Sequence, residues 1–216
     1  MIFGKIDYIN LLPFYVYMKR NLRFSKELAS LHYKKGVPAQ INRDFRYRRI
    51  DAAFISSIAS KKYSCQNVGI VAHKKVLSVI LIPGENKIDK ESATSNALTK
   101  ILGLQGSVLI GDKALRYALK NSDYLDLADE WYERYKMPFV FARLCCHKPN
   151  KKFTKLSRQF VKTNVKIPAY IMKKTALKHE ISQSDIKAYL QLIKYDITKS
   201  EKKSLKKFFE LYKNSL

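Results

Sequence analysis

The first fourteen residues place a strand and a helix in immediate succession, and this constrains the fold. Apolar and polar side chains alternate over residues 2–7, the pattern of a short strand. Pro13 then indicates a helix that has just begun, because the first-turn amides of a helix have no partner within it. Asn10 falls between the two, at the carboxyl end of a strand, where open α/β folds bind ligands. Read locally, Asn10 is either a helix cap or a ligand-binding residue.

The same order of strand, small polar residues and helix recurs along the chain. Residues 50–55 form an apolar-rich strand, and Ser56 and Ser57 stand before the next helix. The other candidates are Ser78 within the apolar run 76–82, Thr94 and Ser95 at a hydroxyl-rich helix start, and Gly111 with Asp112 after the strand at 106–110. Each has a structural reading as a cap or turn residue. Placed together at one sheet edge, they would line a cleft for a small carboxylate.

Strands alternate with helices up to about residue 145, which predicts an α/β fold with a mostly parallel sheet. Two such units without a linker predict two lobes around a ligand cleft. We assign residues 1–77 and 146–216 to the first lobe and residues 78–145 to a shorter second lobe. After residue 146 the pattern predicts helices alone, as a helical C-terminal tail packed on the first lobe.

The net charge of +24 is unusual and is compatible with nucleic acid, a membrane surface or an anionic small molecule as partner. The basic residues are spread along the chain and are denser only over residues 199–213, which favours solvated surface lysines over a nucleic-acid footprint. No apolar stretch approaches the roughly 20 residues needed to cross a bilayer, and the N-terminus lacks the pattern of a secretion signal. We therefore expect a cytoplasmic protein with neither a membrane nor a nucleic-acid partner.

Three cysteines include the adjacent pair Cys145 and Cys146, which is a poor basis for disulfides. We expect a reducing compartment and two buried structural cysteines. His147 extends the pair into a soft-ligand cluster, but adjacent strand residues point to opposite faces and would hardly ligate one metal. The sequence also lacks the P-loop, the GxGxxG fingerprint, the GxSxG elbow and the HExxH zinc motif. We expect no metal site.

Six segments resemble, in their order, the chorismate dehydratase family (MqnA) of menaquinone biosynthesis through futalosine: GKIDYINLLPF, IDAAFISSIAS, SVILIP, ATSNALTKIL, VLIGDKAL and DLADEWYERYKMPFVFA. The resemblance covers residues 4–142 and is weaker in the tail. It implies a fold like type 2 periplasmic binding proteins, used in the cytoplasm as an enzyme. It implies that chorismate is dehydrated to 3-[(1-carboxyvinyl)oxy]benzoate without a metal or organic cofactor. It also implies ligand contacts at Asn10, Ser56, Ser57, Ser78, Thr94 and Ser95.

These contacts suggest roles in the implied reaction. Thr94 and Ser95, with Ser78 nearby, would stabilise charge on the ring carboxylate, and Asn10 would orient the hydroxyl or the side-chain carboxylate. The other acid group would be held by Ser56 and Ser57. No acidic residue stands in a motif as the base, and Asp112 reads as a turn residue. The substrate's own enolpyruvyl carboxylate is therefore the expected proton acceptor.

The chain departs from the family pattern in two places. It is shorter than typical relatives between Leu102 and Gly106, which bears on the second lobe. Leu144 stands where relatives often have tryptophan, which bears on one pocket wall. Two alternatives stay open: the more distant sister enzyme that makes 1,4-dihydroxy-6-naphthoate, and a non-catalytic small-anion binding protein of the same fold. The oligomeric state, monomer or homodimer, also stays open.

Overall fold

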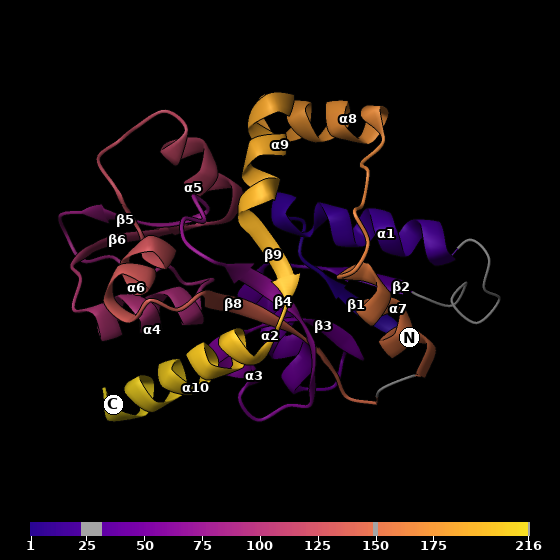
Figure 1. Ribbon diagram of the computed structural model, residues 1–216, viewed down its shortest axis with the longest axis horizontal. Helices are drawn as coiled ribbons and strands as arrows, with labels where there is room; N and C mark the ends of the chain where they lie inside the picture. The colour runs from indigo at the N-terminus through magenta and orange to yellow at the C-terminus, as the bar shows by residue number, and fades with distance from the viewer. Residues whose placement is uncertain (23–31, 149–150, 216) are drawn as a thin grey trace.

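Two separate β-sheets organise the computed structural model, which describes residues 1–22, 32–148 and 151–215. The larger sheet contains β1 (Ile2–Lys5), β2 (His32–Lys35), β3 (Ala52–Ser56), β4 (Cys65–Ala72), β8 (Phe139–Cys146) and β9 (Ile193–Asp196). The smaller sheet contains β5 (Val79–Pro83), β6 (Gly106–Ile110) and β7 (Leu125–Asp126). The strands follow the orders β2-β1-β3-β8-β4-β9 and β6-β5-β7. In Figure 1 the smaller sheet lies to the left of the larger one.

Helices surround both sheets, and local sequence signals set several of their ends. They are η1 (Ile9–Leu11), α1 (Leu12–Leu22), α2 (Pro38–Arg46), α3 (Ser57–Ser60), α4 (Ala93–Leu102), α5 (Gly111–Ala118), α6 (Leu127–Tyr135), α7 (Lys151–Phe160), α8 (Ala169–His179), α9 (Gln183–Leu192) and α10 (Lys199–Asn214). Pro38 stands in the first turn of α2, Ser92 caps α4, and a capping box of Thr198 and Glu201 opens α10. These signals are local, so the sequence predicts most elements within a few residues.

The prediction of a mostly parallel sheet is wrong. β1 runs parallel to β2 and β3, whereas β8 is antiparallel to both β3 and β4, and β9 is antiparallel to β4. The smaller sheet is antiparallel throughout. The chain leaves the larger sheet after β4, forms the smaller sheet, and returns along β8 in the opposite direction beside β4. Alternating elements predict crossovers, but they do not reveal that the chain changes sheets.

The expectation that strands end at residue 146 is also wrong. The helical pattern after residue 146 is interrupted, because α9 ends at Leu192 and β9 continues to Asp196 at the edge of the larger sheet. Ile193 is buried there. A four-residue edge strand directly after a helix keeps an apolar spacing compatible with either structure, so periodicity did not separate them.

The expectation for the cysteines needs a correction as well. Cys145 forms a disulfide with Cys65, while Cys146 is buried and unpaired. The register explains the pairing, because Cys65 of β4 lies directly opposite Cys145 of β8. Cys146, one residue on, points to the other face, as expected. Burial raises the pKa of its thiol to about 12, which keeps it protonated at neutral pH.

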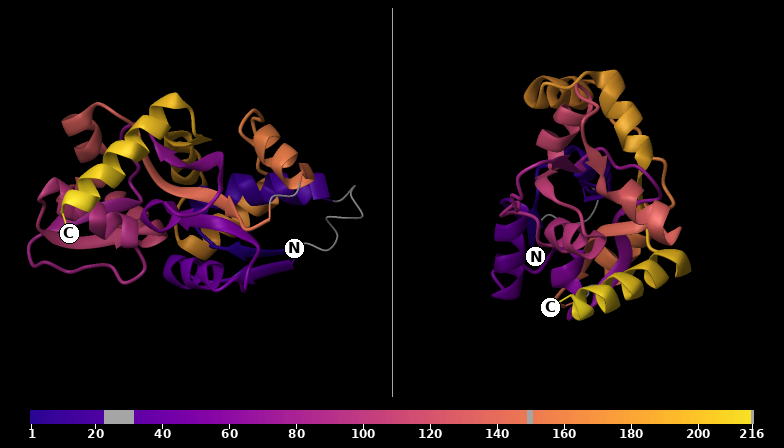
Figure 2. Two further views of the ribbon diagram at one scale, coloured as in Figure 1. Left: turned by 90° about the horizontal axis from the view of Figure 1, so that it is seen from below. Right: turned by 90° about the vertical axis from the view of Figure 1, so that its left-hand side faces the viewer.

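The architecture is the two-lobed α/β arrangement that the sequence predicts, with one hydrophobic cluster extending through both sheets. The tail contacts more than the first lobe: α7 packs on α1 and β4, and α10 packs on both β8 and α4. Figure 2 shows α10 extending along one side of the molecule toward the smaller sheet. β8 (Phe139–Cys146) crosses the boundary predicted at residue 145 and lies in the larger sheet. The lobe boundaries themselves stay a prediction.

Candidate active site

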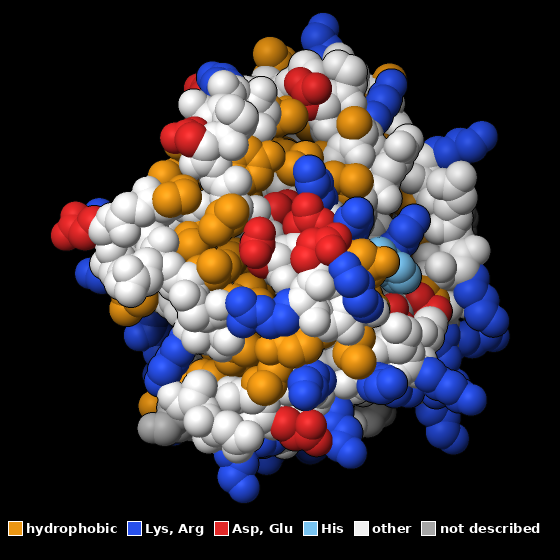
Figure 3. Space-filling view, turned by 60° about the vertical axis from the view of Figure 1, so that its left-hand side comes forward, with side chains coloured by type: hydrophobic (Ala, Val, Ile, Leu, Met, Phe, Trp, Pro, Cys, Tyr) orange, Lys and Arg blue, Asp and Glu red, His pale blue; other side chains and the backbone are white. Residues whose placement is uncertain are grey.

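A cavity of about 90 Å³ lies between elements of the two sheets. It brings together six of the eight site residues expected from the sequence: Asn10, Ser56, Ser78, Thr94, Ser95 and Gly111. Apolar walls come from both sheets and include Phe54, Phe141 and Ile110. Among the residues that the structure describes, no lysine or arginine lines this cavity. Figure 3 shows basic side chains distributed over one face of the molecule, both at its edge and nearer its centre, where acidic side chains also lie.

Asn10 occupies the middle of η1, and the backbone around it is fixed by the tail. The Tyr195 hydroxyl donates a hydrogen bond of 2.7 Å to the Asn10 carbonyl oxygen. The side-chain oxygen Oδ1 of Asn10 is buried and has no hydrogen-bond partner. A buried amide oxygen without a partner among the described residues costs free energy, and Asn10 lines the cavity.

Ser78 lies just before β5 and is 1% exposed. The Tyr189 hydroxyl, on α9, donates a hydrogen bond of 2.8 Å to Ser78 Oγ. The Gly111 amide donates to the Ser78 carbonyl oxygen at 2.8 Å, which ties the residue before β5 to the start of α5. Ser78 is therefore held at two points, its hydroxyl by Tyr189 and its carbonyl oxygen by Gly111, while it lines the cavity.

Ser56 ends β3, and its position is fixed by a residue of α2. The Ser56 amide donates to Asn42 Oδ1 at 3.1 Å, and Asn42 Nδ2 donates to Ser56 Oγ at 2.9 Å. A side-chain amide thus engages both polar groups of Ser56. The local pattern around Asn42 gave no signal for this role, because the contact depends on how α2 packs against β3.

Thr94 and Ser95 stand in the first turn of α4, where Ser92 is the N-cap. Ser92 Oγ accepts a hydrogen bond from the Ser95 amide and donates one of 2.6 Å to Ser95 Oγ. Thr94 Oγ1 accepts from the Ile58 amide of α3 at 3.1 Å. Because α3 follows β3 and α4 follows β5, this last bond joins the two sides of the cavity. The helix start also favours negative charge nearby.

Ser57 and Asp112 lie outside the cavity lining. Ser57 Oγ donates a hydrogen bond to the Val140 carbonyl oxygen at 2.5 Å and is fully buried. Asp112 belongs to the first turn of α5 instead of a turn between elements, so that expectation is corrected. Its Oδ1 accepts from the Ile9 amide, and its Oδ2 lies 2.9 Å from His179 Nδ1. Burial raises the pKa of Asp112, while the Ile9 hydrogen bond and His179 oppose that shift.

Gly111 permits a close approach that a side chain would block. Its φ is +65°, and a Cβ atom built there would lie 2.6 Å from the Tyr8 ring. Tyr8 lines the cavity, and its hydroxyl donates a hydrogen bond of 3.4 Å to Glu91 Oε2. Burial, together with the Glu91 carboxylate, raises the pKa of Tyr8. Sequence reasoning missed both Tyr8 and Glu91, although Tyr8 is part of the opening segment.

Leu144 does not form a wall of the cavity. It is fully buried and lies opposite Phe54 in the sheet, while Ala142, two residues earlier, lines the cavity. No group of three or more His, Cys, Asp and Glu side chains capable of holding a metal occurs among residues 1–22, 32–148 and 151–215. Within the same residues, no helix is long and apolar enough to cross a membrane.

The chemistry available is therefore recognition of an anion by neutral donors, although the Glu91 carboxylate also lines the cavity. Hydroxyl groups and a helix start face one small, largely apolar space. A charge-assisted hydrogen bond contributes about 1.5–3 kcal/mol, and burial strengthens it. Several such bonds would hold a small dicarboxylate without any cationic side chain.

The chain is similar to known proteins over nearly its whole length. A family model described as menaquinone biosynthesis matches residues 1–106 and 101–214. A chorismate dehydratase of Campylobacter jejuni is 46% identical, over 99% of this chain and 98% of the relative. A solved structure of an Archaeoglobus fulgidus protein superimposes with a TM-score of 0.74 at 15% identity, covering 99% of this chain and 96% of that one.

The fold is shared with transport proteins. The periplasmic aliphatic sulphonate binding protein SsuA of Escherichia coli superimposes with a TM-score of 0.64 at 13% identity, covering 99% of this chain and 86% of that one. This likeness concerns the fold alone and confirms the periplasmic-binding-protein-like architecture. Taken with the family match over nearly the whole chain, it leads to one conclusion: the chain belongs to the menaquinone-biosynthesis family that includes this chorismate dehydratase.

Proposed function

We propose that this chain is a chorismate dehydratase, a hydro-lyase that converts chorismate to 3-[(1-carboxyvinyl)oxy]benzoate and water. The observation that carries the proposal is the cavity, where a buried unpartnered amide oxygen of Asn10 meets hydroxyl groups from both sheets. The 46% identity to a chorismate dehydratase supports the substrate. The chemistry of chorismate fits, because it carries two carboxylates and a hydroxyl on one small ring.

The reaction removes the ring C3 proton and the C4 hydroxyl, and the ring becomes aromatic. Negative charge develops toward the ring carboxylate as the C3–H bond breaks. We assign Thr94, Ser95 and Ser78 to that carboxylate, since stabilising developing charge with fixed donors is an effective catalytic device. Asn10 Oδ1 would accept a hydrogen bond from the C4 hydroxyl and hold it in the orientation for departure.

The proton acceptor in this proposal is the substrate's enolpyruvyl carboxylate, which then passes the proton to the departing C4 hydroxyl, so that water leaves and the carboxylate is restored. Asp112 is unsuitable because both its oxygens are engaged outside the cavity, by Ile9 and by His179. Glu91 does line the cavity, but it accepts the Tyr8 hydrogen bond. Replacing Glu91 by Gln should keep that acceptor and leave most of the turnover intact. A loss of turnover comparable to that of Asn10→Ala would make Glu91 the base instead.

The enclosed volume has a consequence for substrate entry. Ligand cavities usually measure about 300–1,000 Å³, and this cavity is much smaller at about 90 Å³. Substrate entry would therefore require the two sheets and their helices to move apart. Closure around the substrate would then exclude water from the reacting groups.

The test is to incubate purified protein with chorismate and to follow the ultraviolet spectrum and the products by chromatography. We expect chorismate to disappear and 3-[(1-carboxyvinyl)oxy]benzoate to accumulate. The Asn10→Ala variant, purified in the same way, is the matched control for contaminating activity. Chorismate that stays unchanged, while the Campylobacter jejuni relative is active in parallel, would refute the proposal. Tight binding without conversion would instead indicate a small-anion binding protein.

A further inference from the structure

Each of the four expected substrate-binding hydroxyls that line the cavity already accepts a hydrogen bond from the protein. The donors are Asn42 Nδ2 for Ser56, the Tyr189 hydroxyl for Ser78, the Ile58 amide for Thr94 and the Ser92 hydroxyl for Ser95. A hydroxyl group has one hydrogen and two lone pairs. With a lone pair occupied in each case, the hydrogen of each hydroxyl remains for a ligand.

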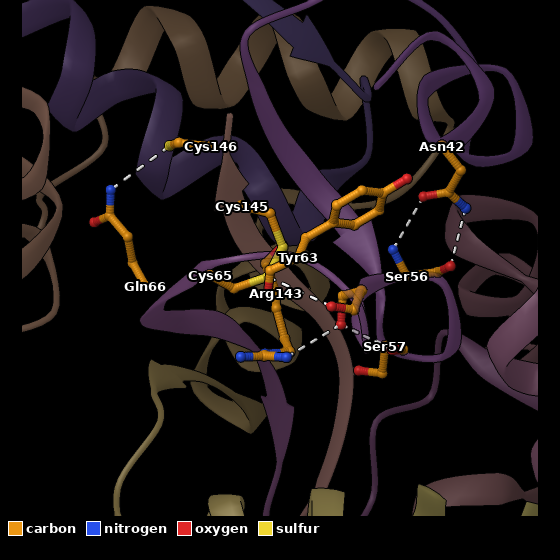
Figure 4. The surroundings of a disulfide bond; sticks show 10 residues. Asn42, Ser56, Ser57, Tyr63, Cys65, Gln66, Arg143, Cys145 and Cys146 are labelled. Carbon is orange, nitrogen blue, oxygen red and sulfur yellow. Dashed lines mark hydrogen bonds between the residues drawn. A yellow bond between two sulfur atoms is a disulfide. The ribbon is translucent and has the colours of Figure 1, made fainter. Parts of the chain in front are cut away.

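The direction of the bond at Ser56 is fixed by covalent chemistry. The Ser56 backbone N–H can only donate, so the Asn42 atom facing it, at 3.1 Å, must be the amide oxygen. The Asn42 NH₂ group then faces Ser56 Oγ at 2.9 Å and donates to it. Figure 4 shows the two parallel bonds between these residues. Asn42 itself does not line the cavity.

Ser78 is arranged in a similar way by a residue far away in the sequence. Tyr189 is 2% exposed and donates to Ser78 Oγ at 2.8 Å. The Asn10 side chain also hydrogen-bonds with the Tyr189 hydroxyl. Burial raises the pKa of Tyr189, so the phenol keeps its proton and remains a donor. A chain of hydrogen bonds thus connects Asn10, Tyr189 and Ser78, and such chains polarise their members.

We propose that Asn42 and Tyr189 are positioning residues that commit the Ser56 and Ser78 hydroxyls as donors into the cavity. The cavity then selects ligands with anionic oxygens, although no cationic side chain lines it among the described residues. This inference rests on the proposed function for the identity of the ligand. It does not depend on the chemical step, because the donors would bind product as well as substrate.

The sharpest test is Asn42→Asp, which keeps the size of the side chain. One carboxylate oxygen can still accept the hydrogen bond from the Ser56 amide. The other oxygen replaces the Asn42 NH₂ group and can only accept, so the Ser56 hydroxyl donates to it and no longer to the ligand. We expect KM to rise about 10- to 100-fold, the effect of one charge-assisted hydrogen bond. The ratio of the variant's KM to the wild-type KM should shrink as pH falls, because the protonated carboxyl can again donate a hydrogen bond to the Ser56 hydroxyl. Asn121→Asp, an exposed residue far from the cavity, controls for the added charge.

Tyr189→Phe tests the second half of the inference. It removes only the hydroxyl that donates to Ser78, so we expect kcat to fall about tenfold with a smaller change in KM. Tyr15→Phe is the matched control, because Tyr15 bonds to the Ile6 backbone and does not line the cavity. Its kcat and KM should equal those of the wild type. Thermal melting of each variant separates folding from binding.

Product affinity measured by calorimetry keeps the two proposals apart. Wild type that binds 3-[(1-carboxyvinyl)oxy]benzoate but does not convert chorismate would refute the proposed reaction, while weaker binding by Asn42→Asp would still support the inference. Folded Asn42→Asp and Tyr189→Phe variants with wild-type kcat, KM and product affinity would overturn the inference. If Tyr189→Phe fails to fold, the pH dependence of Asn42→Asp decides. A ratio of the Asn42→Asp KM to the wild-type KM that does not change with pH would overturn the inference.

Discussion

Asp112 Oδ1 accepts a hydrogen bond of 3.1 Å from the Ile9 amide, the residue immediately before Asn10. The carboxylate stands at the start of α5, so it connects the helix after β6 with η1 beside β1. Its other oxygen faces His179 at the end of α8, and Arg116 donates to the His179 carbonyl oxygen at 3.1 Å. A group outside the cavity thereby joins three segments of the chain near Asn10.

Two substitutions of Asp112 should distinguish its contact with the Ile9 amide from its contact with His179. Asp112→Ala leaves the Ile9 amide without a partner, and we expect the free energy of unfolding to fall by about 1–3 kcal/mol. Asp112→Asn keeps an oxygen for the Ile9 amide, so its loss should be smaller. Urea unfolding followed by circular dichroism measures both. Equal stability of Asp112→Ala and wild type would show that the contact contributes nothing.

Asn10→Ala should affect turnover much more than folding. The Asn10 side-chain oxygen has no partner among the described residues, and the side chain shares one hydrogen bond with the Tyr189 hydroxyl, so deleting it should change the free energy of unfolding by only about 1 kcal/mol. Loss of a group that acts on the reacting hydroxyl should lower kcat/KM about 10²- to 10³-fold. Steady-state kinetics and thermal melting decide, with Asn121→Ala as the exposed control. Full activity would remove Asn10 from the mechanism.

Adjacent serines at the end of β3 should behave differently. Ser57 donates to the Val140 carbonyl oxygen, so Ser57→Ala should cost about 1 kcal/mol of stability and change KM little. Ser56→Ala should raise KM about tenfold, because it removes a donor that faces the cavity. Parallel measurements of KM and of the melting temperature test the pair. A larger effect of Ser57→Ala on KM would return Ser57 to the binding site.

The ion pair between Asp44 and Lys34 should make the stability of the protein depend on pH. The Lys34 ammonium, 2.9 Å away, lowers the pKa of the buried Asp44 carboxyl, and Arg49 contributes further. A lowered folded pKa means that the contribution is complete above the unfolded value of about 3.9 and is lost as pH falls through the folded value. Wild type should therefore exceed Asp44→Asn in stability at pH 6, and the difference should begin to shrink at about pH 4 and vanish only below the lowered folded pKa of Asp44. Thermal melting from pH 7 to pH 2.5 tests this, and a difference that grows with acid would contradict it.

Residues with a purely local signal were predictable from the sequence. Asn10, Ser56 and Thr94 each follow or precede an element whose pattern is clear, and the cavity brings them together. Ser57 shows the limit of such reasoning. At the change from strand to helix, neighbouring side chains point in different directions, and only packing decides which one faces the cavity.

Other features depend on contacts between distant segments. Asn42 and Tyr189 lie 14 and 111 residues from their serines, so no motif around them indicates a role. The sheet direction was missed for the same reason, because it depends on where the chain changes sheets. The disulfide between Cys65 and Cys145 follows from the β4–β8 register, which the sequence pattern does not fix.

The chain passes from β4 to the smaller sheet and returns along β8, which lies beside β4 as its antiparallel neighbour. We expect these two neighbouring backbones to act as a hinge that lets the two sheets open more easily than it lets them twist. Ser78 lies on the outgoing backbone and Ala142 on the returning one, close to the axis of opening. Thr94 and Ser95 belong to α4, which follows β5 and is separated from β4 and β8 by more of the chain. We expect an incoming ligand to meet Ser78 and Asn10 first, and to contact α4 only as the halves close.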